Sequence, residues 1–423
     1  MSNTLHATAN GNRMSGPPGI QRLVFVNRFF YPDSSATSQI LSDLAFAMAE
    51  RGFDIHVITS RRQRVGNELA LPAKETVRGV SVHRTVIPDL DQLGLVGRAI
   101  EYAAFYPSAA VALLYHVRRG DIVVAKTDPP MIAVVADLVS RLRGAKLVNW
   151  IQDLYPEVAI RLGVPLVRGQ IGVLLEKIRD AILKNAAANV AIGERMAEFI
   201  VARGVAGDKI RVIPNWTDDE AIAPVPATQN PLRVCLGLEN AFIVGYSGNL
   251  GRVHEFETVL GAADLLRCET HLVFLVIGRG VYIDALRERV HAQGLDDSFR
   301  FLPVQSRSSL KYSLSLPDVH WLSLRPDLEG LIVPSKFYGI AAAGRPVISI
   351  TAKDGEIARL VKNAYCGVVI EPGVSSELAS CIMLLRNDRA ICEVMGKNAR
   401  ALIDERFSTK QALATWSELL ENL

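Results

Sequence analysis

The chain lacks the features that would assign it at once to several common functional classes. Its five cysteines are odd in number and form no C-x-x-C pair, which predicts buried thiols in a reducing compartment rather than disulfides or a cysteine metal site. No phosphate-binding loop of the form G-x-x-x-x-G-K-[ST] occurs, and no expected strand of the first half carries G-x-G-x-x-G. P-loop nucleotide hydrolysis and dinucleotide-dependent redox chemistry therefore lose support.

Two further absences concern partners and location. No dense run of Arg and Lys with interleaved aromatic residues appears, so nucleic acid is not an expected partner. Residues 1–18 are polar and rich in Gly and Pro, without the apolar stretch of a signal peptide, so we expect a disordered tail and a cytoplasmic protein. With 423 residues, 49% of them apolar, the chain is long enough for two or three domains with substantial cores.

The small net charge of +3 is unevenly placed. Residues 1–215 carry 26 Lys and Arg against 19 Asp and Glu, whereas residues 216–423 carry 21 against 25. A basic half beside an acidic half predicts that the first half meets something anionic, such as a phospholipid surface or a phosphorylated acceptor.

Short apolar segments alternate with segments of helix length, and a Pro- and Asp-rich linker interrupts them at 213–232. The alternation predicts an α/β fold of two Rossmann-like, doubly wound parallel sheets facing across a cleft, since ligands bind beyond the carboxyl ends of such strands. The expected units are a tail (1–18), a first domain (19–222), a linker (223–240), a second domain (241–407) and a C-terminal helix (408–423). The expected strands are Arg22–Asn27, Asp54–Thr59, Ile122–Ala125, Lys146–Ile151, Asn189–Ile192, Ile210–Ile213, Phe242–Ser247, His271–Ile277, Phe299–Leu302, His320–Ser323, Val347–Ile350 and Gly367–Ile370.

The most informative stretch is EGLIVPSKFYGIAAAGRPVI, which begins at Glu329. Pro334 and Ser335 predict a helix start, with Lys336 in the first turn and the end of the helix at Gly344. Free N–H groups at a helix start bind anions, whereas a lysine there normally opposes the helix dipole. A lysine and a helix end aimed at one spot therefore predict a diphosphate site, and the alternative is a solvated surface lysine.

Two glycine-containing turns follow expected strands of the second half. YSGNLGR follows the first of these strands, and IGRG follows the second, where Ile283 replaces the third glycine of a dinucleotide fingerprint. Glycines at such turns let a ligand approach the backbone, although turns also need glycine for their own geometry. The residues predicted to contact a donor phosphate here are Gly248, Asn249, Arg252, Gly278, Arg279 and Gly280.

Seven segments can be compared with a known family: FFYPDSSATSQILSDLAFAMAERG, NWIQDLYPE, KIRVIPNW, YSGNLGR, FLPVQSRSSL, LEGLIVPSKFYGIAAAGRPV and DGEIARL. In this order, from residue 29 to about residue 360, they resemble the family 4 retaining glycosyltransferases of GT-B architecture, especially bacterial members that build exopolysaccharides and O-antigens. IPNW and PSKFYGIAAAGRPV are the most specific pieces. The resemblance implies donor binding mainly in the second domain, acceptor binding in the first, retention of anomeric configuration, and neither a metal ion nor another cofactor.

The chain departs from the family pattern at three places. Family members place an Arg and, five positions later, a Lys on the donor diphosphate, whereas this sequence has Asn249 and His254 there. Gly339 stands where the family has a glutamate that grips the donor ribose. Glu329 lies two positions before the place of the other family glutamate. The cations left to hold the diphosphate are Lys336, Arg279 and Arg252.

The expected chemistry follows from the charge of the leaving group. Cleavage at the anomeric carbon leaves negative charge on the nucleotide diphosphate, which the fixed cation of Lys336 would stabilise. Glu329 would contact sugar hydroxyls, and Asp153 would either orient the acceptor hydroxyl or cap a helix. Glu356 either replaces the missing ribose contact or starts a helix. The other donor contacts implied by the resemblance are Val304, Gly330, Leu331, Ile332, Val333 and Ser335.

The acceptor side is predicted from the first strand-to-helix loop, YPDSSATSQ, and from the segment after the strand Lys146–Ile151. The hydroxyl-rich loop would face the cleft, although Ser38 and Gln39 could instead only begin the helix. The predicted acceptor contacts are Tyr31, Asp33, Ser38, Gln39 and Glu157.

A further segment of the first half, Tyr102–Tyr115, contains no charged residue and is too short to span a bilayer. Because Arg98, Arg118 and Arg119 flank it, the segment either lies in a membrane interface or forms a buried core helix.

The sequence thus predicts a cytoplasmic, or peripherally membrane-bound, glycosyltransferase. It would move a sugar from a nucleotide diphosphate donor, expected to be a UDP-sugar, to a glycan acceptor such as a polyprenyl-diphosphate-linked polysaccharide precursor. One alternative is a nucleotide-sugar 2-epimerase of the same fold, which would need grouped acid and base residues; His83, His254 and His271 show no such grouping in the sequence. The other alternative is a non-catalytic nucleotide-sugar-binding protein.

Overall fold

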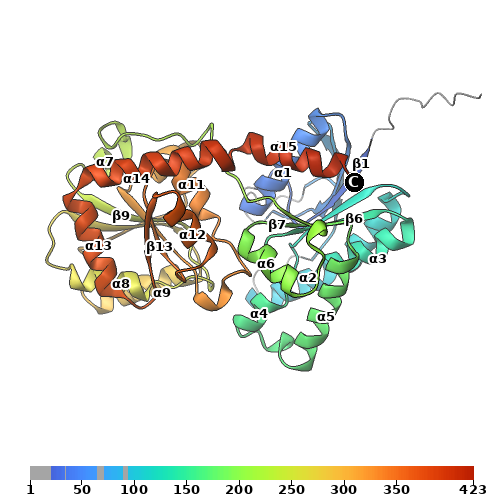
Figure 1. The fold of residues 1–423 in the computed structure, drawn as a ribbon, viewed down its shortest axis with the longest axis horizontal. Helices are drawn as coiled ribbons and strands as arrows, with labels where there is room; N and C mark the ends of the chain where they lie inside the picture. Colours follow the sequence, from blue (N-terminus) through green and yellow to red (C-terminus); the bar gives the residue numbers. More distant parts are fainter. Residues whose placement is uncertain (1–20, 34, 64–70, 89–93) are drawn as a thin grey trace, which may run out of the picture.

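The computed structural model describes residues 21–423 except residue 34 and residues 64–70 and 89–93. The predicted tail, residues 1–18, lies outside this described part. The described chain forms two α/β domains that lie side by side, each built around its own sheet (Figure 1).

The first domain is built on an eight-stranded sheet in the order β3-β4-β2-β1-β5-β6-β7-β8. Neighbouring strands are parallel except β3 and β4. The strands are β1 (Arg22–Val26), β2 (Asp54–Ser60), β3 (Lys74–Val77), β4 (Val80–Thr85), β5 (Ile122–Lys126), β6 (Lys146–Ile151), β7 (Ala188–Ala191) and β8 (Ile210–Val212). The helices are α1 (Ala36–Glu50), α2 (Gly94–His116), α3 (Ala133–Arg143), α4 (Glu157–Arg161), α5 (Gln170–Asn185) and α6 (Glu194–Ala202).

The second domain is built on a six-stranded, fully parallel sheet in the order β11-β10-β9-β12-β13-β14. The strands are β9 (Phe242–Asn249), β10 (Leu272–Arg279), β11 (Phe299–Leu302), β12 (Val319–Ser323), β13 (Val347–Ile350) and β14 (Gly367–Ile370). The helices are α7 (Pro231–Cys235), α8 (Glu257–Leu265), α9 (Val281–Ala292), α10 (Leu310–Leu314), α11 (Lys336–Ala342), α12 (Glu356–Asn363), α13 (Ser375–Asn387), α14 (Arg389–Leu402), the π-helical turn η7 (Ile403–Phe407) and α15 (Thr409–Glu421).

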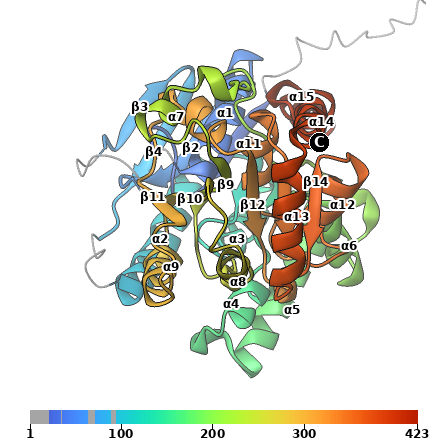
Figure 2. The ribbon, with the colours of Figure 1, turned by 90° about the vertical axis from the view of Figure 1, so that its left-hand side faces the viewer.

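Helices cover both faces of the second sheet, and Figure 2 looks onto this domain. One face packs against α8, α9 and α13, and the other packs against α11 and α12. Every residue of β1, β12 and β13 is buried, because these strands are covered on both faces. Strands in such positions are nearly continuous apolar runs in the sequence. The predicted α/β class with two parallel, doubly wound sheets is confirmed.

The hairpin of β3 and β4 at the edge of the first sheet is not among the predicted strands. Its two-residue turn is Arg78-Gly79, and both residues have positive φ, at 49° and 80°. Tight hairpin turns of this kind favour Asn-Gly or Asp-Gly, so Arg78 hid the turn from a reading based on composition.

The C-terminal helix α15 returns to the first domain and lies beside α1 (Figure 1). Arg51 of the first domain donates a hydrogen bond to the Leu413 carbonyl oxygen at 3.1 Å. In the core below, Trp150 of β6 contacts Trp416 of α15, with ring centroids 4.7 Å apart, and stacks on Trp216 of the linker at 6.0 Å. The end of the chain is therefore part of the first domain's core and ties the second domain to it.

Candidate active site between the two domains

The two domains meet through loops that follow the carboxyl ends of parallel strands. The backbone N–H of Leu154, after β6, donates to the carbonyl oxygen of Leu331, after β12, at 2.9 Å, and Asp153 forms an antiparallel bridge with Ile332. In the second sheet β9 lies between β10 and β12, so strand order reverses there, which is the usual place for a ligand in an open α/β sheet. We call the residues at or after the carboxyl ends of β6, β9, β10, β12 and β13 the interdomain site. The predicted residues among them include Asp153, Gly248, Arg252, Arg279, Glu329, Lys336 and Glu356.

Lys336 lies at the centre of the interdomain site and begins α11, with Ser335 as the exposed N-cap. Its Nζ donates a hydrogen bond to Nε2 of the buried His254 at 2.8 Å. The Nδ1–H of His254 in turn donates to the carbonyl oxygen of Ser323 at the end of β12. Since a carbonyl can only accept, Nδ1 carries the ring proton and Nε2 accepts from the lysine. His254 therefore holds Lys336 in one orientation.

Burial sets the protonation states of this pair. It lowers the pKa of Lys336 to about 8, because the charged ammonium loses hydration. Burial, reinforced by the neighbouring Lys336 charge, lowers the pKa of His254 to about 3. At neutral pH the pair is therefore a lysine cation against a neutral imidazole. No carboxylate of the described residues forms an ion pair with Lys336, so the cation is available to an anion.

Three glycines shape the backbone beside Lys336. Gly248, at the end of β9, has φ +129°, and a Cβ there would lie 3.0 Å from Lys336 Cε. A side chain at Gly278 would collide with the Gly248 carbonyl, and one at Gly280 would collide with the backbone of Leu250. The glycines of the two predicted turns therefore serve their mutual packing, and Gly248 also makes room for the lysine stem.

Two exposed arginines lie at the same strand ends. Arg279 ends β10, and its guanidinium makes no hydrogen bond or ion pair with the residues that the structure describes. Arg252, after β9, donates to the Leu162 carbonyl oxygen of the first domain at 2.8 Å and has no carboxylate partner among those residues. Asn249 ends β9 and is also exposed. Together with Lys336 these arginines give the second domain three cations without counter-ions.

Two predicted carboxylates of the interdomain site, those of Glu329 and Glu356, each accept a hydrogen bond from the first turn of a helix. The Glu329 carboxylate accepts a hydrogen bond from the Glu356 N–H, in the first turn of α12, at 3.3 Å. The Glu356 carboxylate reaches the first turn of α6 in the first domain and accepts from the Arg195 N–H at 2.8 Å. Burial raises the pKa of both carboxyls, that of Glu329 to about 7. Arg195 also forms an ion pair with Asp354 at 2.9 Å, which adds a second link between the first and second domains.

The remaining predicted donor residues differ in burial and backbone conformation. Gly330 has φ +75° and packs against the backbone of Arg195, whereas Val333 is buried and Val304, after β11, is exposed. At Gly339, inside α11, a Cβ would meet only ordinary contacts. The glycine in place of the expected glutamate is therefore not imposed by packing.

The predicted acceptor residues differ in their exposure. Tyr31 is 45% exposed, whereas Asp33 is buried and accepts from the Ser35 N–H at 2.8 Å. Ser38 is fully buried inside α1, and Gln39 beside it is partly buried. Glu157, at the start of α4, holds a buried ion pair with Arg179, with one hydrogen bond of 2.8 Å. Tyr31 is the residue of this set that offers the most free surface.

One contact in the first domain had no signal in the sequence. The side-chain amide of Gln152, after β6, exchanges two hydrogen bonds of 3.0 Å with the amide of Asn215 in the IPNW segment. The Gln152 N–H also donates to Thr127 Oγ1 at 3.0 Å. The loop that carries Asp153 is thus fixed by neighbours on both sides, and only a tertiary contact reveals the partner of Asn215.

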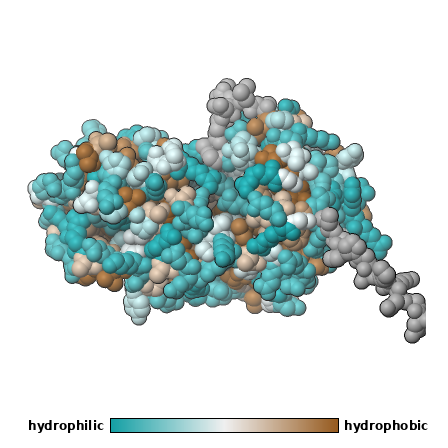
Figure 3. Space-filling view, turned by 90° about the horizontal axis from the view of Figure 1, so that it is seen from above, coloured by the Kyte–Doolittle hydropathy of each residue, from teal (hydrophilic) through white to brown (hydrophobic). Residues whose placement is uncertain are grey.

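Helix α2 contains the uncharged segment Tyr102–Tyr115 and has two different faces. Phe105 and Leu113 are fully buried against the first sheet, whereas Val111 and Tyr115 are 67% and 77% exposed. A core helix is therefore correct for one face. No helix in the described part of the chain is long and apolar enough to cross a membrane. On the surface seen in Figure 3, apolar residues are scattered rather than gathered into one band.

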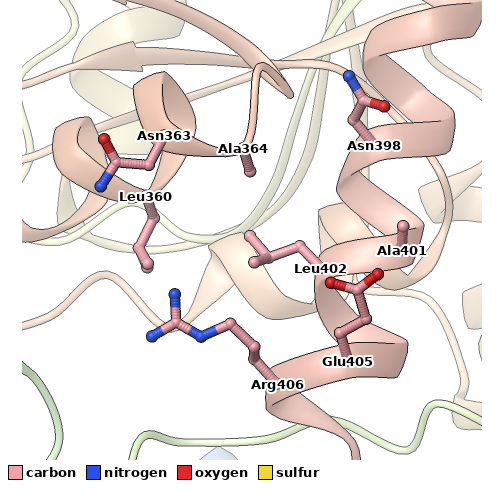
Figure 4. Close-up of a pocket in the computed structure, with 8 residues that line it drawn as sticks. All are labelled: Leu360, Asn363, Ala364, Asn398, Ala401, Leu402, Glu405 and Arg406. Atoms are coloured by element: carbon pink, nitrogen blue, oxygen red, sulfur yellow. The ribbon is translucent and has the colours of Figure 1, made fainter.

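A separate hollow lies on the second domain between the last half of α12 and the end of α14 (Figure 4). Leu360, Asn398 and Arg406 are among its lining residues, and Figure 4 shows their side chains around it. None of the predicted site residues lines it, so it is distinct from the interdomain site.

Comparison with known proteins adds independent information. A family profile described as a glycosyl transferase 4-like domain matches residues 36–216, and one described as glycosyl transferases group 1 matches residues 233–402. The probable glycosyltransferase WbjE of Pseudomonas aeruginosa is 27% identical over 310 residues, which cover 71% of this chain and 74% of WbjE. The putative colanic acid biosynthesis glycosyl transferase WcaI of Escherichia coli K12 is 26% identical over 359 residues, covering 81% and 86%.

Solved structures show the same fold at lower identity. The Anabaena protein Alr3699/HepE in complex with UDP superposes with a TM-score of 0.72 at 17% identity, covering 95% of this chain and 100% of that one. The sucrose-phosphate synthase of Thermosynechococcus elongatus also gives 0.72, at 18% identity, covering 95% and 98%.

Proposed function

The chain belongs to the family 4 glycosyltransferases of GT-B fold, and from this membership we propose that it transfers a sugar from a UDP-sugar to a polysaccharide precursor with retention of configuration. Relatives support the acceptor class, since WcaI is named for colanic acid biosynthesis. Fold neighbours support the donor class, since the Anabaena protein was solved with UDP and with UDP-glucose.

The observation that carries this proposal is Lys336. Its ammonium has a neutral imidazole rather than a carboxylate as its hydrogen-bond partner, and it lies where strand order reverses in the second sheet. A fixed cation of this kind stabilises charge that develops on a departing diphosphate without reorganising during the reaction. Arg252 and Arg279 supply further positive charge at the same strand ends.

In the proposed mechanism the bond between the anomeric carbon and the donor phosphate breaks, and its electron pair stays on the diphosphate. Lys336 stabilises that charge without a metal ion. The acceptor hydroxyl attacks on the leaving-group face, and the departing phosphate oxygen takes its proton. Asp153, fixed between the domains at Ile332, orients the hydroxyl, while Glu329 contacts sugar hydroxyls.

We also propose that the protein works at an anionic membrane surface, where a lipid-linked acceptor would be found. The first half carries the excess of basic residues. The outward face of α2 presents Val111 and Tyr115, and Arg118 and Arg119 follow the helix. An apolar strip beside basic residues is the pattern of an interfacial helix.

The proposal is tested by measuring nucleoside diphosphate release from UDP-, GDP- and ADP-sugars with a lipid-linked glycan acceptor, in magnesium and in EDTA. A thermal-shift screen selects the donor first, because a ligand of the native state raises the melting temperature. We expect a UDP-sugar to be turned over equally in both buffers and the product to keep the donor's anomeric configuration. An inverted product would contradict the proposed mechanism, and donor binding without acceptor-dependent release would favour a binding protein.

A further inference from the structure

Three histidines far apart in the sequence come together on the first domain, outside the interdomain site. They are His56 of β2, His83 of β4 and His116, the last residue of α2. One ring nitrogen from each lies within 4.8 Å of the others. The rings of His83 and His116 stack at 3.7 Å between centroids, and His56 and His83 stack at 5.3 Å. His56 lies near the amino end of β2, whereas the interdomain site is at carboxyl ends, so the cluster is separate from it.

Hydrogen bonds show which ring nitrogens of this cluster face one another. His56 Nε2 lies 3.2 Å from a carboxylate oxygen of Asp54, which can only accept when ionised, so His56 carries its proton on Nε2. His56 Nδ1 therefore accepts a hydrogen bond from His83 Nε2 at 3.0 Å, and a metal ion would take the place of the shared proton. His83 Nδ1 is buried and has no hydrogen-bond partner among the described residues. A carboxylate that holds the remote nitrogen of a histidine is a common outer neighbour of metal sites.

Charged side chains of both signs surround the cluster. Arg22 pairs with Asp54 at 3.1 Å and with Asp121 at 3.0 Å, and it also donates to the His116 carbonyl oxygen. Lys74 and Arg118 are the other cations near the cluster. A metal ion binds the neutral imidazole, so binding would release any proton that occupies a ligand nitrogen.

We propose that His56, His83 and His116 form a three-histidine site for one divalent transition-metal ion, with Zn²⁺ as the expected occupant. Imidazole ligands favour Zn²⁺, Ni²⁺ or Cu²⁺ over Mg²⁺ and Ca²⁺, which prefer oxygen. Metal–nitrogen bonds of about 2.0–2.1 Å in tetrahedral geometry place two ligand nitrogens roughly 3.3 Å apart. The observed 3.0 Å between His56 Nδ1 and His83 Nε2 is close to this spacing, whereas the His116 ring would have to turn out of its stack on His83 to direct a lone pair at the same ion. A water molecule or an anion would take the fourth position.

The bound ion would join β2, β4 and the end of α2. The hairpin of β3 and β4 is an edge element, and α2 lies against β4. We therefore assign the ion a structural role, so its removal should lower thermal stability without removing the chemistry of the interdomain site. This inference is independent of the proposed donor and acceptor.

The test is calorimetric titration of the tag-free, metal-stripped full chain with ZnCl₂. We expect one ion per chain and a rise in melting temperature on binding. His83→Gln and His116→Gln should each weaken binding by at least about tenfold, since even loss of an outer-shell partner costs about 10–100-fold. His291→Gln is the matched control, because His291 is exposed and pairs only with Asp296. Cys235 and Cys268 are exposed, so the prediction of buried thiols is wrong for these two, and Cys235→Ser and Cys268→Ser test them as competing ligands.

Circular dichroism checks that each variant is folded. If a histidine variant does not fold, the visible spectrum of the Co²⁺-loaded wild-type protein decides. Nitrogen ligation without a thiolate charge-transfer band supports the site, and a thiolate band contradicts it. The proposal is also overturned by no binding at micromolar Zn²⁺, by loss of binding in the cysteine variants, or by unchanged binding in both histidine variants. In any of these cases the cluster is three neutral, stacked imidazoles that pack without a metal.

Discussion

At the scale of single residues, Lys336 is a charge that folding places in an unfavourable position. Its folded pKa of about 8 lies below the ordinary value of 10.5, so the folded protein disfavours the charged form. Below pH 8 the lysine is charged in both the folded and the unfolded protein, so burial of the charge lowers the free energy of unfolding by its full amount. Between pH 8 and 10.5 only the unfolded chain keeps the proton, so stability rises with pH and the cost disappears.

Lys336→Met should therefore raise the melting temperature at pH 7, because an apolar side chain of similar length replaces a partly buried cation. The gain should shrink as pH approaches 10. Scanning calorimetry from pH 7 to 10 measures it, with Lys311→Met as a control at another partly buried lysine of the same domain. A lower melting temperature for Lys336→Met would show that the lysine stabilises the fold.

The same pKa predicts how activity depends on pH. kcat/KM reports the free enzyme, so it should fall above pH 8 as Lys336 loses its proton. Lys336→Arg should have a lower plateau, because a planar fork replaces a compact charge, but no fall near pH 8, because arginine stays protonated. Donor-dependent rates between pH 6 and 9.5 separate the two profiles. An identical fall in both proteins would assign the titration to another group.

His254 should act through Lys336. As the acceptor of the lysine's hydrogen bond it favours the charged form, so His254→Phe should lower the Lys336 pKa further. A hydrogen bond to a charged group contributes about 1.5–3 kcal/mol, so the fall in kcat/KM should move about one pH unit lower. His291→Gln should leave the profile unchanged. A uniform loss of rate without a shift would mean that His254 only fills space.

At the scale of secondary structure, the sequence was sufficient to predict strand bounds wherever a clear apolar run lay between turn residues. Strands β6, β11, β13 and β14 lie within the predicted bounds because apolar runs between turn residues define them. The site was less accessible, since its key contacts join distant positions. In the sequence, His254 only replaces the lysine that family members have at this position. Its hydrogen bond with Lys336, 82 positions later, becomes visible only in the folded structure. The three-histidine cluster has no sequence signature for the same reason.

Helix α2 gives a prediction at this scale. Val111→Asp with Tyr115→Asp should abolish binding to anionic liposomes while leaving the fold intact, because both side chains are exposed. Binding of the wild-type protein should weaken as salt rises, since screening reaches about 8 Å at physiological ionic strength. Leu113 is unsuitable for this test because it is buried in the core. Wild-type protein that floats with neither neutral nor anionic vesicles would rule out the membrane role.

At the scale of the whole molecule, the two domains share one interior. The largest cluster of buried apolar residues runs from the first sheet through Leu154, Leu328 and Leu331 to α11 of the second domain. Helix α15 adds Trp416 to the same cluster from the far end of the chain. This joint core, with the bridge between Asp153 and Ile332, holds the acceptor-side loop against the segment that leads to Lys336.

The most direct test of the account is nucleoside diphosphate release by wild-type and Lys336→Ala protein, measured side by side in EDTA with the selected donor and acceptor. We predict that Lys336→Ala is folded, is at least as stable as the wild type, and turns over about 100-fold or more slowly, the effect of removing one preorganised donor. Arg279→Ala should cost less, because its guanidinium is exposed. A stable and fully active Lys336→Ala protein would contradict the account and place the diphosphate on other residues.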